Sequence, residues 1–183
     1  MEIFFATTNL GKLGEATKIL KEIGIKVKHF PFVYNEIRSD SIEEVARDAV
    51  KFAYKRLKEP VFVEDTGLFI EKWNGFPGTY SAVMLKKLGN EGIIKLMEGE
   101  PNRAALFDTC IAYHDTNGTT VAHGKCYGRI SESIRGKSGF GFDSIFIPDG
   151  GEQTFAESIE LKNKLSHRYK SLLEFSKSLK LRR

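Results

Sequence analysis

The sequence predicts an α/β fold in which helices cover a mixed β-sheet. Two observations indicate this class. Strand-like and helix-like segments alternate early in the chain, and a long antiparallel hairpin follows around Asn117-Gly118, a pair typical of tight hairpin turns. A chain of 183 residues can form one domain, or two lobes that share a core. We expect a single domain over residues 1–183, within which the composition marks no lobe boundary.

The N-terminal part alternates between the two kinds of element. Residues 2–6, EIFFA, predict a short strand, and apolar residues at helical spacing over 13–23 predict a helix that stops at Gly24. Residues 25–29 predict a second strand. After an irregular connection, Ser41 and Glu44 have the spacing of a capping box and predict the start of a second helix, which extends to about residue 57.

The remaining elements are predicted from shorter patterns. VFVED, residues 61–65, predicts a buried strand that breaks at Thr66-Gly67 and continues extended to residue 73. The other predicted segments are two short helices near 81–88 and 91–97, hairpin strands over 105–115 and 119–130, a glycine-rich loop over 136–148 that leads into a strand, and a final helix over 166–179.

The composition argues against several classes of protein. No apolar run approaches the roughly 20 residues of a membrane span, and we see no signal peptide, so we expect a cytoplasmic protein. The net charge of +4, from 28 basic and 24 acidic residues, favours phosphate-bearing partners. We expect no stable nucleic-acid partner, because the basic residues form no block interleaved with aromatic residues. They are densest at the C-terminal helix end, at Lys177, Lys180, Arg182 and Arg183.

Cysteine usage fits a reducing compartment. Cys110 and Cys126 are too few for a disulfide framework or a zinc site, so we expect two packed thiols. Their similar distances from Asn117-Gly118 leave a cross-strand approach open as the alternative.

The turn between the first strand and the first helix carries small polar residues, a glycine and a lysine. Ligands of open α/β sheets sit where strands end and helices begin, and a helix N-terminus suits phosphate. Thr7, Thr8 and Asn9 add donors there, and Lys12 adds a full charge. The same residues also suit an ordinary helix cap, and their spacing is not that of a Walker loop.

Paired carboxylates follow the third predicted strand. Glu64 and Asp65 lie side by side at its end, where carboxylate oxygens suit Mg²⁺. Glu36 becomes relevant if the fold brings it near Asp65, and Lys51 either reaches these acids or faces solvent. The triplet D-T-G at Asp65 is also an aspartic-protease signature, but that class needs a second triplet, which this chain lacks.

Cations gather where the final helix is predicted to start, at Lys162, Lys164, His167 and Arg168. Because cations oppose the helix dipole there, we expect a nearby acid or a bound nucleotide to compensate them.

The segment GFGFD combines glycines with aromatic residues. Gly139 and Gly141 allow the backbone to approach a ligand closely, and Phe140 can stack on a base. Phe142 is better interpreted as a core residue at the strand entry.

The order of these motifs is more specific than any one of them. TTNLGKLGE, Glu36, EDTGL, GFPGTYSA, GFGFDSIF and KNKLSHR follow one another along nearly the whole chain. This order resembles the inosine triphosphate pyrophosphatase family, whose members hydrolyse non-standard purine nucleoside triphosphates. The family commonly has proline where this chain has Ser144, a departure that we expect to loosen the loop.

The resemblance implies a fold, an activity and partners. It implies a long mixed β-sheet dividing two α/β lobes with a central substrate cleft, a homodimer, and Mg²⁺-dependent hydrolysis of ITP, dITP and XTP to the monophosphate and pyrophosphate. Asp65 would be the general base and would hold the metal with Glu36. The implied substrate-binding residues are Thr7, Thr8, Asn9, Leu10, Gly11, Lys12, Lys51, Thr66, Phe140, Gly141, Phe142, Asp143, Lys162, His167 and Arg168.

Base selection is expected to depend on hydrogen-bond donors. His167 and Arg168 would donate to the 6-oxo group of the base, whereas Phe140 would stack without selecting. Two alternatives stay open: a Maf-type pyrophosphatase for modified pyrimidine nucleotides, and a nucleotide-binding or RNA-binding module without catalysis.

Overall fold

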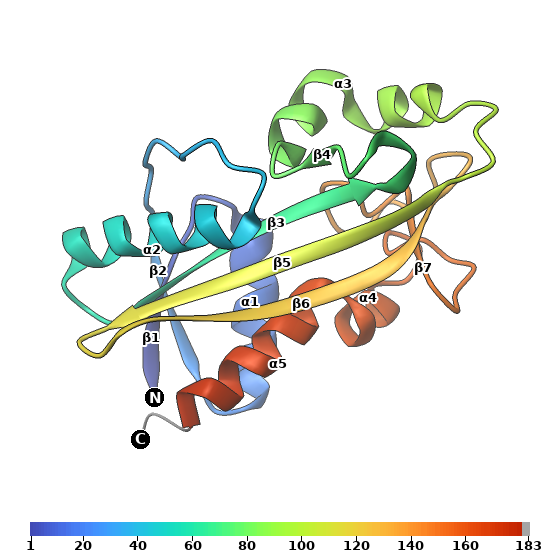
Figure 1. Ribbon diagram of the computed structural model, residues 1–183. Helices are drawn as coiled ribbons and strands as arrows, with labels where there is room; N and C mark the ends of the chain where they lie inside the picture. The colour runs from blue at the N-terminus through green and yellow to red at the C-terminus, as the bar shows by residue number, and fades with distance from the viewer. Residues whose placement is uncertain (181–183) are drawn as a thin grey trace. The chain divides into compact units, whose positions relative to one another are not determined.

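The computed structural model describes residues 1–180, and within them seven strands form one mixed sheet (Figure 1). The strand order is β2-β1-β3-β5-β6-β7, and β4 pairs with β3. β1 is parallel to β2 and β3, whereas β4 is antiparallel to β3 and β7 to β6. The predicted mixed α/β fold is therefore confirmed. The elements are β1 (Glu2–Ala6), α1 (Leu10–Glu22), β2 (Lys26–Phe30), α2 (Ile42–Leu57), β3 (Val61–Ile70), β4 (Pro77–Gly78), α3 (Ser81–Leu96), β5 (Ala104–Asp115), β6 (Gly118–Ile130), β7 (Phe146–Pro148), α4 (Ile159–Leu165) and α5 (His167–Lys180).

The chain forms two compact units, and each is assembled from separate stretches of sequence. The first unit contains residues 1–65, 109–124 and those from 168 onward, and the second contains residues 66–108 and 125–167. Each of β3, β5 and β6 contributes residues to both units. A division that falls within strands leaves no mark on the composition.

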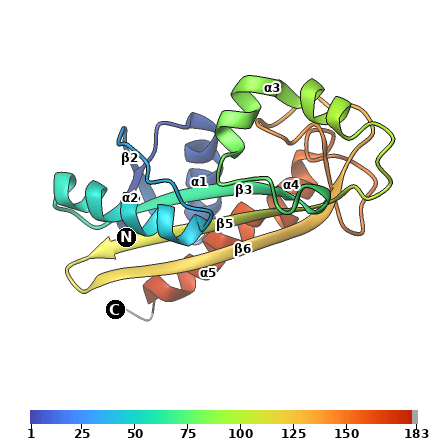
Figure 2. The same cartoon turned by 45° about the horizontal axis from the view of Figure 1, so that its top comes forward.

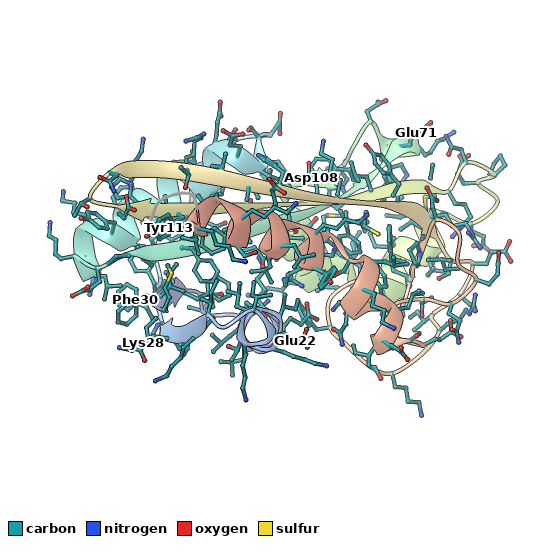
Figure 3. The ribbon with its side chains drawn as sticks, turned by 90° about the horizontal axis from the view of Figure 1, so that it is seen from below. Glu22, Lys28, Phe30, Glu71, Asp108 and Tyr113 are labelled. Atoms are coloured by element: carbon teal, nitrogen blue, oxygen red, sulfur yellow. The ribbon has the colours of Figure 1, made fainter. Side chains whose placement is uncertain are left out.

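In the first unit, helices cover both faces of the strands. α1 and α5 lie on one face and α2 lies on the other (Figure 1). On the α1 and α5 face, Phe5 of β1 stacks on Phe62 of β3 with ring centroids 4.3 Å apart, and Phe175 of α5 packs against Phe62 at 5.1 Å. Figure 3 views this face with α5 crossing in front of the strands, and Tyr113 of β5 also contacts Phe175. These rings belong to the core of the first unit.

The two predicted helix starts in the first unit are confirmed. Asn9 caps α1, because its side chain accepts a 3.0 Å hydrogen bond from the amide of Lys12. Ser41 caps α2 by accepting from the amide of Glu44 at 3.3 Å. The Glu44 carboxylate does not complete the capping box, since it accepts from the hydroxyl of Ser39, which in turn accepts from the amide of Ser41.

The second unit has its own apolar core, in which Phe107, Phe146 and Phe155 pack together. α3 bends at Gly89, whose backbone has φ of 66° and ψ of −176° and interrupts the helix. This bend explains why the sequence predicts two short helices there.

The predicted hairpin is also confirmed, since β5 and β6 flank Thr116 and Asn117.

The predicted break at Thr66-Gly67 is wrong. β3 runs without interruption from Val61 to Ile70, and the predicted extension to residue 73 is a 3₁₀ turn from Glu71 to Trp73. A Cβ on Gly67 would lie 2.5 Å from the carbonyl oxygen of Gly78 in β4. Glycine is therefore required here by the close approach of a neighbouring strand.

The predicted final helix over 166–179 is confirmed as α5, which begins at His167 and Arg168, but the placement of Lys162 and Lys164 at its start is wrong. Lys162 and Lys164 lie in the last turn of a separate helix, α4, where positive charge is favourable. Ser158 caps α4, and α5 begins only at His167. A seven-residue helix carries too short a pattern to be recognised in the sequence. Of the predicted basic C-terminal end, Arg182 and Arg183 lie outside the described residues.

Cys110 and Cys126 are both free and buried, so the prediction of two packed thiols is confirmed. Across residues 1–180, none of the helices is long and apolar enough to cross a membrane.

Two glycine substitutions should have opposite effects on stability. Gly67→Ala should lower the free energy of unfolding by about 1–3 kcal/mol, because its methyl group must displace the β4 backbone. Gly14→Ala should raise it by about 0.5–1 kcal/mol, since alanine favours helix and no atom lies within 4 Å of the place that its methyl group would take on α1. Urea unfolding of both variants measures the contrast, and equal stabilities would contradict it.

Candidate active site

The turn that enters α1 is fixed from both sides by the end of β2. The amide of Thr7 donates to the carbonyl oxygen of Phe30 at 3.1 Å, and His29 Nε2 donates to the carbonyl oxygen of Thr7 at 2.9 Å. The amide of Asn9 donates to the Thr7 hydroxyl at 3.1 Å. α1 has no acidic residue in its first turn, so its positive N-terminal end is not neutralised locally. The turn, with exposed Thr8, Asn9 and Leu10 and partly exposed Gly11, is therefore suited to an anion.

Lys12 connects this turn to the middle of the sheet. Its Nζ donates to the backbone carbonyl of Glu64 at 3.0 Å and lies 3.5 Å from Glu64 Oε1. The side chain of Lys12 keeps 16% of its surface exposed. Its charge is consequently held at the β3 residue that immediately precedes Asp65.

A buried arginine compensates two acids in the same unit. Arg168, the second residue of α5, binds Glu64 through Nε and Nη2 at 2.8–3.0 Å and binds Glu15 through Nη1 at 2.6 Å. The side chains of Arg168 and Glu64 are 2% and 0% exposed. Burial alone would lower the pKa of Arg168, but the charges of Glu64 and Glu15 raise it above its ordinary value. The positive charge of Arg168 at the start of α5 is thus compensated by nearby acids, one of the two possibilities expected from the sequence.

Glu15 was not predicted as a member of the site, and it has no local sign in the sequence, since it looks like any helix carboxylate. Glu64 was interpreted from the sequence, with Asp65, as a carboxylate suited to Mg²⁺. In the structure the Glu64 carboxylate lies in buried β3, where a charge needs a partner, and it binds Arg168.

Tyr34 lies among aromatic rings of the first unit, and its pKa responds to nearby acidic residues. Its ring stacks between Phe32, at 5.4 Å, and Phe52, at 6.3 Å. Burial raises the pKa of Tyr34, and the negative charges of Glu36, Asp65 and Asp48 raise it further. Glu36 and Asp65, predicted together as metal ligands, therefore act on one phenol. The Asp48 carboxylate, absent from the prediction, has a buried Oδ2 to which nothing in residues 1–180 donates a hydrogen bond.

The carboxylate oxygens of Glu36 and Asp65 are of the kind that a divalent cation such as Mg²⁺ prefers. The acids supply hard oxygen atoms and a negative field, which such an ion prefers. Within the described chain no group of three His, Cys, Asp or Glu residues is arranged to hold a metal by itself. Two carboxylates would leave the remaining positions to water and substrate oxygens, as Mg²⁺ usually requires. Lys51 lies exposed on α2.

In the second unit, Asp143 organises the predicted base-binding residues. Its Oδ2 accepts from Lys162 Nζ at 2.6 Å and from the amide of Phe140 at 2.7 Å. Lys162 is buried, and its Nζ lies 4.4 Å from the centroid of the partly exposed Phe140 ring. A Cβ on Gly139 would lie 2.2 Å from Asp143 Oδ2, so this glycine makes room for the carboxylate.

The other predicted residues of the second unit have different surroundings. Phe142 is buried in the apolar core, in agreement with its interpretation as a core residue. His167 is buried and stacks on Phe107 with ring centroids 4.3 Å apart, and Thr66 lies partly exposed within β3. The hydroxyl of Ser144 accepts a hydrogen bond from Asn90 Nδ2 at 2.9 Å, and the expectation that Ser144 loosens its loop stays a prediction.

Comparison with known proteins identifies the class of protein that has this fold and these residues. The model of the Ham1 family matches residues 3–178, nearly the entire chain. The chain belongs to the Ham1 family.

Individual relatives resemble the chain over nearly their full lengths. A protein of Methanopyrus kandleri named dITP/XTP pyrophosphatase is 49% identical over 178 residues, covering 96% of this chain and 95% of the relative. A protein of Thermococcus kodakarensis with the same name is 45% identical and covers 98% of both chains. The Ham1 protein structure of Staphylococcus aureus has a TM-score of 0.85 at 28% identity, with both chains fully covered.

Removing one partner from the buried arginine should be costly. Glu64→Gln should lower the free energy of unfolding by about 3–5 kcal/mol, because it leaves Arg168 buried with insufficient negative charge. Glu160→Gln is the matched control, since Glu160 pairs with Lys164 at 2.6 Å on the exposed surface of α4 and should leave stability unchanged within error. Chemical denaturation compares the two variants, and similar small losses would show that the Arg168 contacts do not stabilise the fold.

Proposed function

We propose that this protein hydrolyses dITP, ITP and XTP to the nucleoside monophosphate and pyrophosphate. The activity named for two relatives at 45–49% identity over nearly whole chains supports this assignment. The structural observation that carries it is Lys12, which extends from the anion-binding turn and is held by Glu64, next to Asp65. A phosphate-binding cation and a candidate base are thereby presented by the same unit.

Within the first unit, the proposed roles follow from charge. Thr7 to Lys12 bind the triphosphate through backbone amides, hydroxyl groups and one ammonium group, and Lys51 supplies a second cation near the phosphates. Glu36 and Asp65 would hold Mg²⁺, which when bound neutralises phosphate charge and acidifies a water molecule. Asp65 accepts the proton of the attacking water.

The proposed base-binding residues belong to the second unit, with Arg168 of the first. Phe140 stacks on the base, and Lys162 and His167 supply donors for a 6-oxo group. Arg168 donates from Nε and Nη2 to Glu64 and from Nη1 to Glu15, so a contact of Arg168 with the base would be made beside these two carboxylates. A 6-amino group would face donors, which accounts for the expected rejection of ATP.

A substrate panel tests the proposed function. We expect kcat/KM, measured by pyrophosphate release, to be highest for dITP, ITP and XTP and lower by roughly 10⁴-fold for ATP. GTP shares the 6-oxo group, so its rejection requires a contact at its 2-amino group. Equal efficiency with ATP would refute donor-based selection, whereas a preference for pyrimidine triphosphates would indicate Maf-type activity. Binding without pyrophosphate release would indicate a non-catalytic module.

Replacing the proposed base should abolish turnover without unfolding the protein. Asp65→Asn keeps the shape of the side chain but removes its charge, and it should lower kcat by about 100-fold or more. Asp40→Asn, an exposed acid of the 31–40 segment, is the control and should retain normal activity. Chelation of divalent metal should stop the native enzyme, and added Mg²⁺ should restore it. An Asp65→Asn variant with near-normal turnover would remove Asp65 from the mechanism.

We further propose a cytoplasmic homodimer, on the basis of the family resemblance. Sedimentation of the purified protein at twice the monomer mass supports the dimer, and a stable monomer at micromolar concentration refutes it.

A further inference from the structure

Asn90 links the kinked helix α3 to the loop formed by residues 139–144. Its Nδ2 donates to the carbonyl oxygen of Gly141 at 3.0 Å and to the hydroxyl of Ser144 at 2.9 Å. A backbone carbonyl can only accept, so the amide nitrogen of Asn90 has to face it. Figure 2 shows this orange loop segment beside α3.

The local structure of α3 favours this contact over the usual role of asparagine at a helix start. Gly89 breaks the helix with a left-handed φ of 66°, and Asn90 follows at the start of the second helical segment. Gly89 holds the N-cap position of this segment, so Asn90, as its first helical residue, does not cap the helix through Oδ1. Here Oδ1 of Asn90 is buried and accepts no hydrogen bond from any described residue. Both hydrogen bonds of this side chain are donated to the loop, and its buried acceptor is left unsatisfied at a cost in free energy.

The contact fixes the backbone on one side of Phe140. Gly139 and Gly141 flank this residue with φ of 75° and 68°. Because glycine can adopt many backbone conformations, a loop with two glycines needs other contacts to hold one of them. On the N-terminal side, the Phe140 amide is held by Asp143 at 2.7 Å. On the C-terminal side, the carbonyl of Gly141 is held by Asn90. The Phe140 ring is therefore oriented by the buried carboxylate of Asp143 and by the side-chain amide of Asn90 on α3.

We propose that Asn90 is a positioning residue, which holds Phe140 in the orientation that stacks on the nucleobase. This inference rests on the proposed function, in which Phe140 contacts the base. Asn90 contacts the loop and acts on the nucleotide only through Phe140. Its loss should therefore weaken nucleotide binding while leaving the hydrolytic step nearly unchanged.

Steady-state kinetics with dITP provides the first test. Asn90→Asp keeps the shape but removes both donors, and Asn90→Leu removes them without adding charge. Both should raise KM by about 5- to 10-fold, the equivalent of about one net hydrogen bond, and leave kcat within about twofold. Ser144→Ala removes one acceptor and should give a smaller rise. Glu91→Gln, at the exposed neighbouring residue, should leave KM unchanged. A rise in KM for Asn90→Asp but not for Asn90→Leu would overturn the proposal, because it would indicate an effect of the added charge.

A double-mutant cycle distinguishes positioning from general stability. In a Phe140→Ala background there is no ring to orient, so Asn90→Leu should no longer raise KM. If Asn90→Leu raises KM equally in both backgrounds, Asn90 does not act through Phe140 and the proposal is wrong.

Amide hydrogen exchange tests the contact without substrate or turnover. Exchange in residues 139–144 should be faster in Asn90→Leu than in the native protein, with the β5 and β6 amides unchanged. Unchanged loop exchange would overturn the proposal even if dITP is hydrolysed. Faster loop exchange in a protein that fails to hydrolyse dITP, ITP and XTP would refute the proposed function and leave the contact established.

Discussion

The buried contact between Arg168 and Glu64 is the interaction on which the first unit depends. It joins α5 to β3, and through Glu15 it also joins α5 to α1. Because Lys12 donates to the same residue of β3, the turn that enters α1 is joined to this network. Charges in such positions contribute little net stability compared with apolar packing, yet they permit few alternative arrangements. The network holds Lys12 at Glu64, the β3 residue that precedes Asp65.

The second unit also contains a buried cation, which is an ammonium group and not a guanidinium group. Lys162 and Asp143 form a buried ion pair, and the carboxylate also accepts from the backbone of Phe140. An ammonium group has three donors but no planar fork, so it pairs with one carboxylate oxygen and keeps its remaining face over an aromatic ring. In each unit a buried cation is paired with carboxylate, from Glu64 and Glu15 in the first unit and from Asp143, 19 residues away in sequence, in the second. Glu64 and Asp143 also contact the turn or loop beside them.

Local features of the fold could be predicted from the sequence, and contacts between distant residues could not. The caps at Asn9 and Ser41, the hairpin at Asn117 and the helix break at Gly89 each depend on chemistry within a few residues. The sequence suggests a strand break at Gly67, but glycine is required there because another strand approaches closely. The acids around Arg168 lie 104 and 153 residues away in sequence, and no local pattern identifies them as its partners. The family resemblance named Arg168 but could not show what it contacts.

The arrangement of the units in sequence has a consequence for how the chain folds during synthesis. The first unit starts with residue 1 and requires residues from 168 onward, whereas the second lies entirely between them. Glu64 is synthesised 104 residues before Arg168, which at about 5–20 residues per second corresponds to roughly 5–20 s. During that interval a carboxylate destined for the interior has no guanidinium partner and stays hydrated. The second unit ends at residue 167, so both units are completed only when the last segment of the chain has been made, and the first unit acquires its buried guanidinium last.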